Sequence, residues 1–287
     1  MTEPTPDQDL KRPWRRRLAD FLPGYLDGHP VLSPFRARAS VILHGSTTMG
    51  IDDDFSDLDL WLLLPAAATA ELCAAAGTRF FEFRLDGKQG HLNAESTAAF
   101  AGRAHGCHMD TIYQLRSAEI ITDNTGAGGE LIRLARRPMR EEVSQAFFFY
   151  HYVEMRGEHR ACDNPIQRSD PVALLLSLPK VIAHALQAAM VLDGQPYPYD
   201  KWLYRAAGGT PTGRLLTPSV GKVLDLLAAG HLRTGPPESD HPVSLELRVI
   251  RRILVEAAQA KGIREPWLTQ WWLHMHQAQA AIQNVRW

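Results

Sequence analysis

Two aspartates, Asp57 and Asp59, stand at alternate positions at the start of an apolar run. Carboxylates at positions i and i+2 of a β-strand point to the same face, with their Cα atoms about 6–7 Å apart. That separation lets both groups bind a shared pair of divalent cations about 3.5–4 Å apart. Magnesium prefers oxygen ligands and keeps several waters, so two or three carboxylates and substrate phosphates suffice. The pattern therefore predicts a site for two Mg²⁺ ions that acts on phosphoryl groups.

The dipeptide Gly45-Ser46 precedes these aspartates and follows another apolar run. A glycine at a strand end lets backbone N–H groups approach a phosphate closely. The serine adds a hydroxyl donor, and a helical turn over residues 47–50 would aim its N-terminus at the same anion. We interpret Gly45 and Ser46 as phosphate-binding residues, because a Gly-Ser strand end followed by an Asp-x-Asp strand is far more specific than either part alone.

The segments Leu43–Ser46 and Ser56–Leu60 together resemble the signature of the nucleotidyltransferase superfamily. This superfamily includes DNA polymerase β and the kanamycin, spectinomycin and lincosamide nucleotidyltransferases. The resemblance covers about residues 39–64. It implies that the glycine and serine hold the phosphates of a nucleoside triphosphate and that the two aspartates bind magnesium. It also implies a mixed sheet followed by a helical domain.

Members of the superfamily usually carry a third carboxylate on an adjacent strand, where it completes the metal site or takes the proton of the acceptor hydroxyl. We predict Glu95 for this role, because His91, Asn93 and Glu95 share one face of an expected strand. Glu82 and Asp110 remain alternatives. Many relatives have an aspartate or glutamate where His91 or Asn93 stands here. This departure leaves open a non-catalytic nucleotide-binding regulator.

The elements around these residues predict an α/β domain followed by an all-α domain. Short apolar runs separated by turns favour a mixed sheet with helices over residues 1–125, the catalytic domain. We expect strands at 39–44, 58–64, 79–85, 91–96, 109–115 and 119–122, and a helix at 66–76. Strand signals fade over residues 126–287, the expected helical bundle that binds substrate or nucleotide. We expect its helices at 130–136, 139–156, 171–192, 215–227, 243–259 and 266–285.

In the helical part, Lys201 stands beside two prolines and three aromatic residues. We expect Asp200 to cap a helix that begins at Lys201. The segment Tyr197–Leu203 resembles a Tyr-x-x-Lys-Trp-Leu segment of some bacterial nucleotidyltransferases. Lys201 would then reach the triphosphate from the helical domain. The alternative is a solvated lysine beside packed aromatic side chains.

Composition places limits on partners and compartment. The 287 residues have a formal net charge of −1, so the overall charge does not indicate nucleic acid or a membrane surface as a partner. A basic cluster at residues 11–17 is interpreted as a solvated helix face. Three cysteines without a close pair argue against a disulfide framework, and residues 1–10 have no apolar signal core. Pro179, Lys180 and His184 interrupt the most apolar stretch, at 172–192, so we expect a cytoplasmic protein without a membrane span.

We therefore predict an enzyme that moves AMP from ATP to a hydroxyl of a small, aminoglycoside-like acceptor and releases pyrophosphate. Such an acceptor is cationic, and Glu141, Glu142 and Glu154 are candidates to bind it. The alternative enzyme is a toxin-like transferase that acts on tRNA or protein. The tryptophan stripe at 267–272 is typical of a core or of a homodimer surface.

Overall fold

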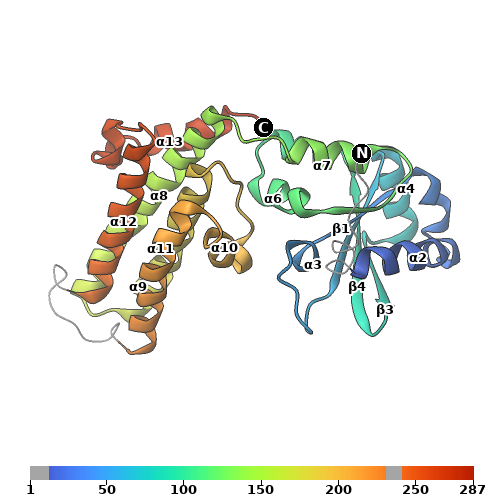
Figure 1. The fold of residues 1–287 in the computed structure, drawn as a ribbon, viewed down its shortest axis with the longest axis horizontal. Helices are drawn as coiled ribbons and strands as arrows, with labels where there is room; N and C mark the ends of the chain where they lie inside the picture. The colour runs from blue at the N-terminus through green and yellow to red at the C-terminus, as the bar shows by residue number, and fades with distance from the viewer. Residues whose placement is uncertain (1–12, 231–240) are drawn as a thin grey trace. The chain divides into compact units, whose positions relative to one another are not determined.

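One mixed β-sheet organises the first half of the chain. In this computed structural model, which describes residues 13–230 and 241–287, the described strands form a sheet of order β3-β4-β2-β1-β5 (Figure 1). Strands β2 and β4 pair parallel, whereas the other neighbours pair antiparallel. The strands are β1 (Ser40–His44), β2 (Leu58–Leu64), β3 (Phe80–Leu85), β4 (Lys88–Ser96) and β5 (Glu119–Asp123).

Helices cover both faces of the sheet. Alternate residues of β2 face opposite sides, so Leu60 belongs to a core with Leu22 and Leu72, whereas Trp61 packs on Phe100 of the other layer. The first layer consists of α2 (Pro13–Gly28), the 3₁₀ turn η1 (Ser33–Arg38) and α4 (Ala66–Ala76). The second contains α5 (Thr97–His105), α6 (Met109–Ser117) and α7 (Ala127–Ala135), and a single turn, α3 (Ser46–Met49), follows β1.

The predicted β1, β2, α4, β5 and β3–β4 hairpin are confirmed, but one expected strand is wrong. Residues 109–117 form helix α6, in which Met109, Ile112 and Leu115 are buried at three-residue spacing. Helix α5 was not predicted. Its cap is Ser96, whose hydroxyl accepts a hydrogen bond from the Ala99 backbone N–H.

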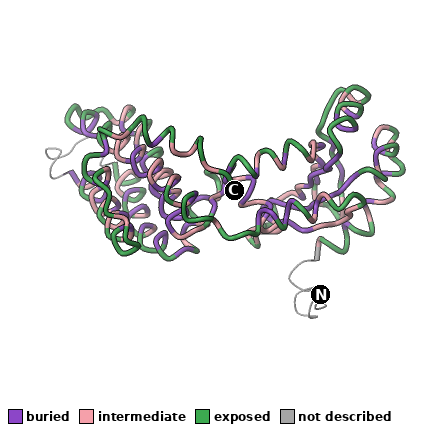
Figure 2. Tube along the Cα trace, turned by 90° about the horizontal axis from the view of Figure 1, so that it is seen from above, coloured by how far each residue is buried: buried purple, intermediate pink, exposed green. Residues whose placement is uncertain are grey.

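The second half of the chain is helical, so the predicted fold class is confirmed. The expected helix at 266–285 is wrong, because the chain turns twice before α13 and packs the buried Leu268 and Trp271 along the way. The helices are α8 (Glu141–Gln167), α9 (Pro171–Leu192), α10 (Asp200–Ala207), α11 (Pro211–Ala228), α12 (Pro242–Ala260), η3 (Pro266–Leu268), η4 (Trp271–Leu273) and α13 (Met275–Gln283). Buried and exposed positions alternate along them (Figure 2).

Two compact units divide the chain between Arg137 and Pro138. We expected a boundary between residues 125 and 126. Helix α7 packs against β1, β5, α5 and α6, which explains why the first unit extends past that point.

Helix α9 is long and apolar enough to cross a membrane by length and composition. Half of the most apolar 18-residue segment of this helix is buried inside the unit. The helix packs against α8, α10, α11 and α12. This burial is typical of the central helix of a helical bundle.

Candidate active site

A tight turn at Gly45 joins β1 to α3. Gly45 has φ +81°, a left-handed conformation that side chains rarely adopt. A Cβ atom at residue 45 would lie 2.8 Å from Oδ2 of Asp59. Glycine is therefore required here twice, once for the backbone conformation and once for the space that the Asp59 carboxylate occupies.

The two aspartates flank Leu58, the fully buried first residue of β2. Because Leu58 points into the core, Asp57 and Asp59 both point to the opposite face, as predicted from their spacing. Asp59 pairs with His44 of β1 in the antiparallel register. The carboxylates thus lie at the end of two inner strands, where β1 ends and β2 begins.

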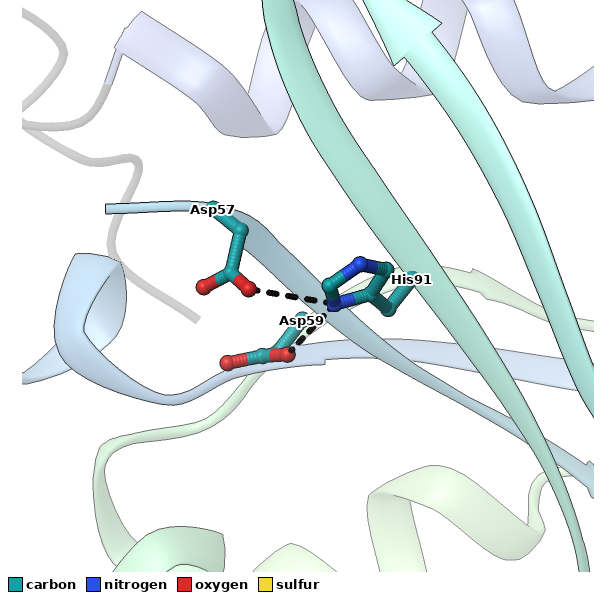
Figure 3. A group of neighbouring side chains, drawn as sticks. All are labelled: Asp57, Asp59 and His91. Carbon is teal, nitrogen blue, oxygen red and sulfur yellow. Dashed lines mark ion pairs between the residues drawn. The ribbon is translucent and has the colours of Figure 1, made fainter. Parts of the chain in front are cut away.

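His91 completes the cluster from the neighbouring strand. The parallel register of β2 and β4 sets His91 beside Asp59, and Figure 3 shows its ring directed at both carboxylates. His91 Nδ1 lies 3.1 Å from Asp57 Oδ2 and 3.7 Å from Asp59 Oδ1. The side chains of His91, Asp59 and Asp57 are 19%, 31% and 41% exposed, so all three remain accessible to a ligand.

These three side chains form a donor set that fits a divalent cation. One ligand atom from each of Asp57, Asp59 and His91 lies within 4.8 Å of the others. Two carboxylate oxygens suit magnesium, whereas an added imidazole nitrogen is a ligand of manganese, iron or zinc sites more often than of magnesium sites. Sequence reasoning treated His91 only as a departure from the expected carboxylate, because the register of the parallel pair is not visible in the sequence.

Glu95 is not brought to this cluster. Glu95 lies four positions beyond His91 on β4, and its register partner on β2 is Leu63. Four residues of a strand place Glu95 about 13 Å from His91. Its carboxylate pairs with Arg103 at 3.5 Å. The predicted face was right, since Leu92 and Ala94 are buried while His91, Asn93 and Glu95 are partly exposed, but the predicted position along the strand was not.

The two alternative carboxylates also lie outside the cluster. Glu82 of β3 stands directly opposite His91 across the antiparallel pair, so its Cβ atom is about 5 Å from that of His91. Its carboxylate accepts a hydrogen bond from Gln89 Nε2 at 3.3 Å. Asp110 lies on helix α6, where it pairs with His108. Of the two, Glu82 is the neighbour of the cluster.

A buried histidine, His44, lies beside Asp59 on the neighbouring strand β1. Its ring stacks on Trp61 at a centroid distance of 3.6 Å, and its Nδ1 lies 3.1 Å from Gln114 Oε1. Burial lowers the pKa of His44 from 6.5 to about 3, an effect that the Gln114 hydrogen bond only partly opposes. His44 is therefore a neutral imidazole, and its Nε2 has no hydrogen-bond partner among the described residues.

Lys201 lies in the second unit, on helix α10. Its side chain is exposed, and its Nζ lies 4.9 Å from the centre of the Trp202 ring. The helix begins at Asp200 after Tyr199, which provides no side-chain cap, so the expected cap by Asp200 is wrong. The approach of Lys201 to a triphosphate stays a prediction.

Comparison with known proteins gives limited information. No family model and no curated protein matches this sequence. Among solved structures, the chain is similar to the crystal structure of a nucleotidyltransferase-like protein from Exiguobacterium sibiricum 255-15. The two are 12% identical, the similarity covers 86% of this chain and 75% of that chain, and the TM-score is 0.46.

Proposed function

We propose that this protein is a metal-dependent nucleotidyltransferase that moves AMP from ATP to a hydroxyl of a small acceptor. The observation that carries the proposal is the cluster of Asp57, Asp59 and His91 beside the side-chain-free turn at Gly45. The cluster supplies cation ligands, and in this proposal the turn beside it presents backbone N–H groups to a phosphate. The resemblance of these same segments to the nucleotidyltransferase signature supports the assignment.

In this proposal each residue of the site has a defined task. Asp57 and Asp59 hold the cation, and the carboxylate of Asp59 occupies the space left by the absent side chain at Gly45. The backbone at Gly45 and the hydroxyl of Ser46 bind the β- and γ-phosphates. A bound divalent cation neutralises charge on the transferring phosphoryl group and lowers the pKa of the acceptor hydroxyl.

We assign His91 as the third ligand, in place of the predicted Glu95. Its Nδ1 is the atom that faces both carboxylates, and its ring is held against Phe80 at a centroid distance of 4.9 Å. A set of two carboxylates and one imidazole accepts manganese as well as magnesium. We therefore propose that manganese supports the reaction at least as well as the magnesium that the sequence suggested.

A cationic acceptor, such as an aminoglycoside, is supported by a cavity in the second unit. This cavity has a volume of about 440 Å³, and Glu141, Glu142 and Glu265 line it beside Phe149 and Trp267. Carboxylates attract ammonium groups, and aromatic faces bind cations and sugar rings. Lys261 also lines the cavity, but its Nζ pairs with Asp193 at 3.3 Å. Glu142 pairs with Arg140 at 2.7 Å, so Glu141 and Glu265 remain to attract an amino sugar.

The direct test is pyrophosphate release from each nucleoside triphosphate, with Mg²⁺ or Mn²⁺, across a panel of aminoglycosides, tRNA and proteins. We expect release that depends on ATP, on metal and on one small hydroxyl-bearing acceptor. The Asp57→Asn/Asp59→Asn double variant is the control, and activity in that variant would refute the proposal.

A second candidate is a regulator that binds a nucleotide without turnover. The presence of His91 at the third ligand position favours it, because an imidazole ligand leaves no third carboxylate to accept a proton. It predicts metal-dependent ATP binding with no pyrophosphate under any acceptor. Equilibrium binding measured beside the release assay separates the two candidates.

Transfer to tRNA has weaker support. Lys11 and Arg12 of the basic cluster lie outside the described residues, and Arg17 is paired with Asp86 at 3.1 Å. Arg15 and Arg16 are exposed on α2. A grip on RNA through these residues would make affinity fall steeply with salt, so a weak salt dependence in the tRNA arm counts against it.

A further inference from the structure

The second unit contains a cavity whose charge is opposite to that of the acidic one. Its volume is about 780 Å³, and it lies among α8, α12 and the residues that follow η3. Four arginines line it, namely Arg156 of α8 and Arg248, Arg251 and Arg252 of α12. The carboxylate among its described lining residues is Glu256, which lies 4.0 Å from Arg252 at an exposed position.

Arg156 has one N–H group without a partner in the described part of the chain, although its guanidinium lies 5.8 Å from the centre of the Trp271 ring and its side chain is hydrogen-bonded with Tyr152. Its Nε atom is buried and has no hydrogen-bond partner among the described residues. Burial lowers the pKa of Arg156, and the positive charge of Arg251 lowers it further, although Tyr152 and Asp163 oppose the shift. A buried guanidinium N–H without an acceptor, next to a like charge, is costly unless an anion supplies the missing partner.

The remaining walls of the cavity are apolar. Leu245, Val249 and Val255 line it along α12, and Leu268 lies at the end of η3. The hydroxyl of Tyr152 donates a hydrogen bond to the Leu268 carbonyl at 2.7 Å, which joins α8 to the η3 turn beside the cavity. A volume in this range suits a small molecule. The apolar walls suit a ligand that carries an organic part as well as a charge.

We propose that this cavity binds a small organic phosphate that carries two or more negative charges. Guanidinium groups bind phosphate oxygens through paired N–H donors, and their fixed planar geometry makes arginine the preferred residue for such recognition. Arg156 and Arg251 contact the phosphate in this proposal, while Arg248 and Arg252 attract it to the cavity. The site is separate from the Asp57–Asp59 cluster and needs no metal, so it does not depend on the proposed transferase activity.

Calorimetric titration of the full chain with ATP, AMP, tripolyphosphate and inorganic phosphate tests the proposal. Chelation by EDTA and the Asp57→Asn/Asp59→Asn background remove metal-dependent binding at the first site. We expect ATP and tripolyphosphate to bind this metal-free background, and to bind more tightly than inorganic phosphate. Arg251→Gln should weaken that binding by about tenfold or more, and Arg251→Lys should recover only part of it.

Arg214→Gln is the matched control, because it removes the same charge from an exposed position of α11 that does not line the cavity. It should leave the affinity unchanged. The absence of binding by ATP and tripolyphosphate at millimolar concentration would overturn the proposal. Equal weakening by Arg214→Gln and Arg251→Gln would also overturn it, since a general charge effect would then explain the affinity.

Thermal unfolding without ligand separates a binding role from a structural one. Removal of the charge of Arg251 relieves its repulsion with Arg156, so Arg251→Gln should unfold at the same temperature as the unmodified chain or at a higher one. A large drop in the unfolding temperature, together with restored stability but no restored binding in Arg251→Lys, would assign Arg251 to the fold and refute the site.

Discussion

The carboxylate of Asp59 occupies the space that a side chain at residue 45 would need. A Cβ atom on Gly45 would stand 2.8 Å from Asp59 Oδ2 and 3.3 Å from Asp59 Cβ. Gly45 directly follows β1, and Asp59 lies on the neighbouring antiparallel strand β2, where it belongs to the cluster with His91. The Asp59 carboxylate, which we assign to cation binding, therefore fills the space beside the turn that we assign to phosphate binding.

Gly45→Ala should reduce both stability and activity. The Gly45 backbone, with φ +81° and ψ −157°, lies in a region that essentially only glycine adopts and that costs about 1–3 kcal/mol for a residue with a Cβ, and the Asp59 carboxylate must also move. Gly50→Ala is the matched control, because Gly50 has φ +69° and a Cβ atom there would meet nothing within 4 Å. Urea unfolding should show a loss for both variants, larger for Gly45→Ala because the Asp59 carboxylate must move there, whereas pyrophosphate release should fall much further in Gly45→Ala. Equal activity in the two variants would contradict the role of the contact.

Asp57→Asn and Asp59→Asn should each lower metal-dependent transfer by at least about a hundredfold, because preorganised charge on the cation site supplies most of the rate. Asp54→Asn removes the same charge from an exposed loop residue nearby and should leave the rate unchanged. Steady-state kinetics with saturating metal checks this. A full rate in either cluster variant would show that its carboxylate is dispensable.

His91→Asp should change which metal the proposed transfer reaction prefers. Replacement of an imidazole nitrogen by a carboxylate oxygen gives the site three oxygen donors, which favours magnesium over manganese. We expect the ratio of the Mg²⁺-supported rate to the Mn²⁺-supported rate to rise by about tenfold, equivalent to about 1.4 kcal/mol. Asn93→Ala, on the same face of β4, should leave the ratio as it is. An unchanged ratio in His91→Asp would exclude His91 as a ligand.

His44 should make the first unit less stable in acid. Its folded pKa of about 3 lies below the ordinary value of 6.5, so the unfolded chain takes up the proton first as the pH falls. The stabilisation is complete above pH 6.5 and is lost as the pH drops towards 3, by about 2–3 kcal/mol at pH 4.5. His44→Gln should lose less stability than the unmodified chain between pH 7 and pH 4.5 in urea unfolding. His105 is exposed, so His105→Gln should lose as much stability between these pH values as the unmodified chain. An equal loss in His44→Gln would contradict the assignment of the acid sensitivity to His44.

Glu95→Gln should leave the rate of transfer unchanged. Glu95 is paired with Arg103 at a partly exposed position, and loss of such an ion pair costs less than about 1 kcal/mol of folding free energy. Kinetics and urea unfolding of the same preparation check both parts. A loss of rate as large as that in Asp57→Asn would restore Glu95 as the proton acceptor.

The sequence predicted the first half of this site because its geometry is local. Strand alternation alone sets Asp57 and Asp59 on one face, and a glycine between two apolar runs marks the turn. The third ligand depends on which residue of β4 lies beside Asp59, and that register follows from long-range parallel pairing. A shift of four positions along one face separates the predicted Glu95 from the observed His91, and local pattern cannot detect it.

The same limit explains the errors in the elements. Residues 109–115 contain threonine, isoleucine and tyrosine, which favour a strand by propensity. The structure instead buries Met109, Ile112 and Leu115 on one side of helix α6, which packs against β1, α5 and α7. Tertiary packing therefore determines the secondary structure of residues 109–115. The end of α4 at a glycine and the turn between β3 and β4 are instead determined by the local sequence.

If Asp57, Asp59 and His91 bind a cation as proposed, the parallel pairing of β2 with β4 also couples the binding of that cation to the folding equilibrium of the first unit. The unfolded chain keeps the two aspartates near each other but separates them from His91, which the β4 strand delivers only when the sheet has formed. A cation that needs all three ligands binds the folded unit alone, so it raises the free energy of unfolding as its concentration rises above its dissociation constant. A cation bound by these three residues would thus also stabilise the pairing of β2 with β4, by an amount that depends on the cation concentration.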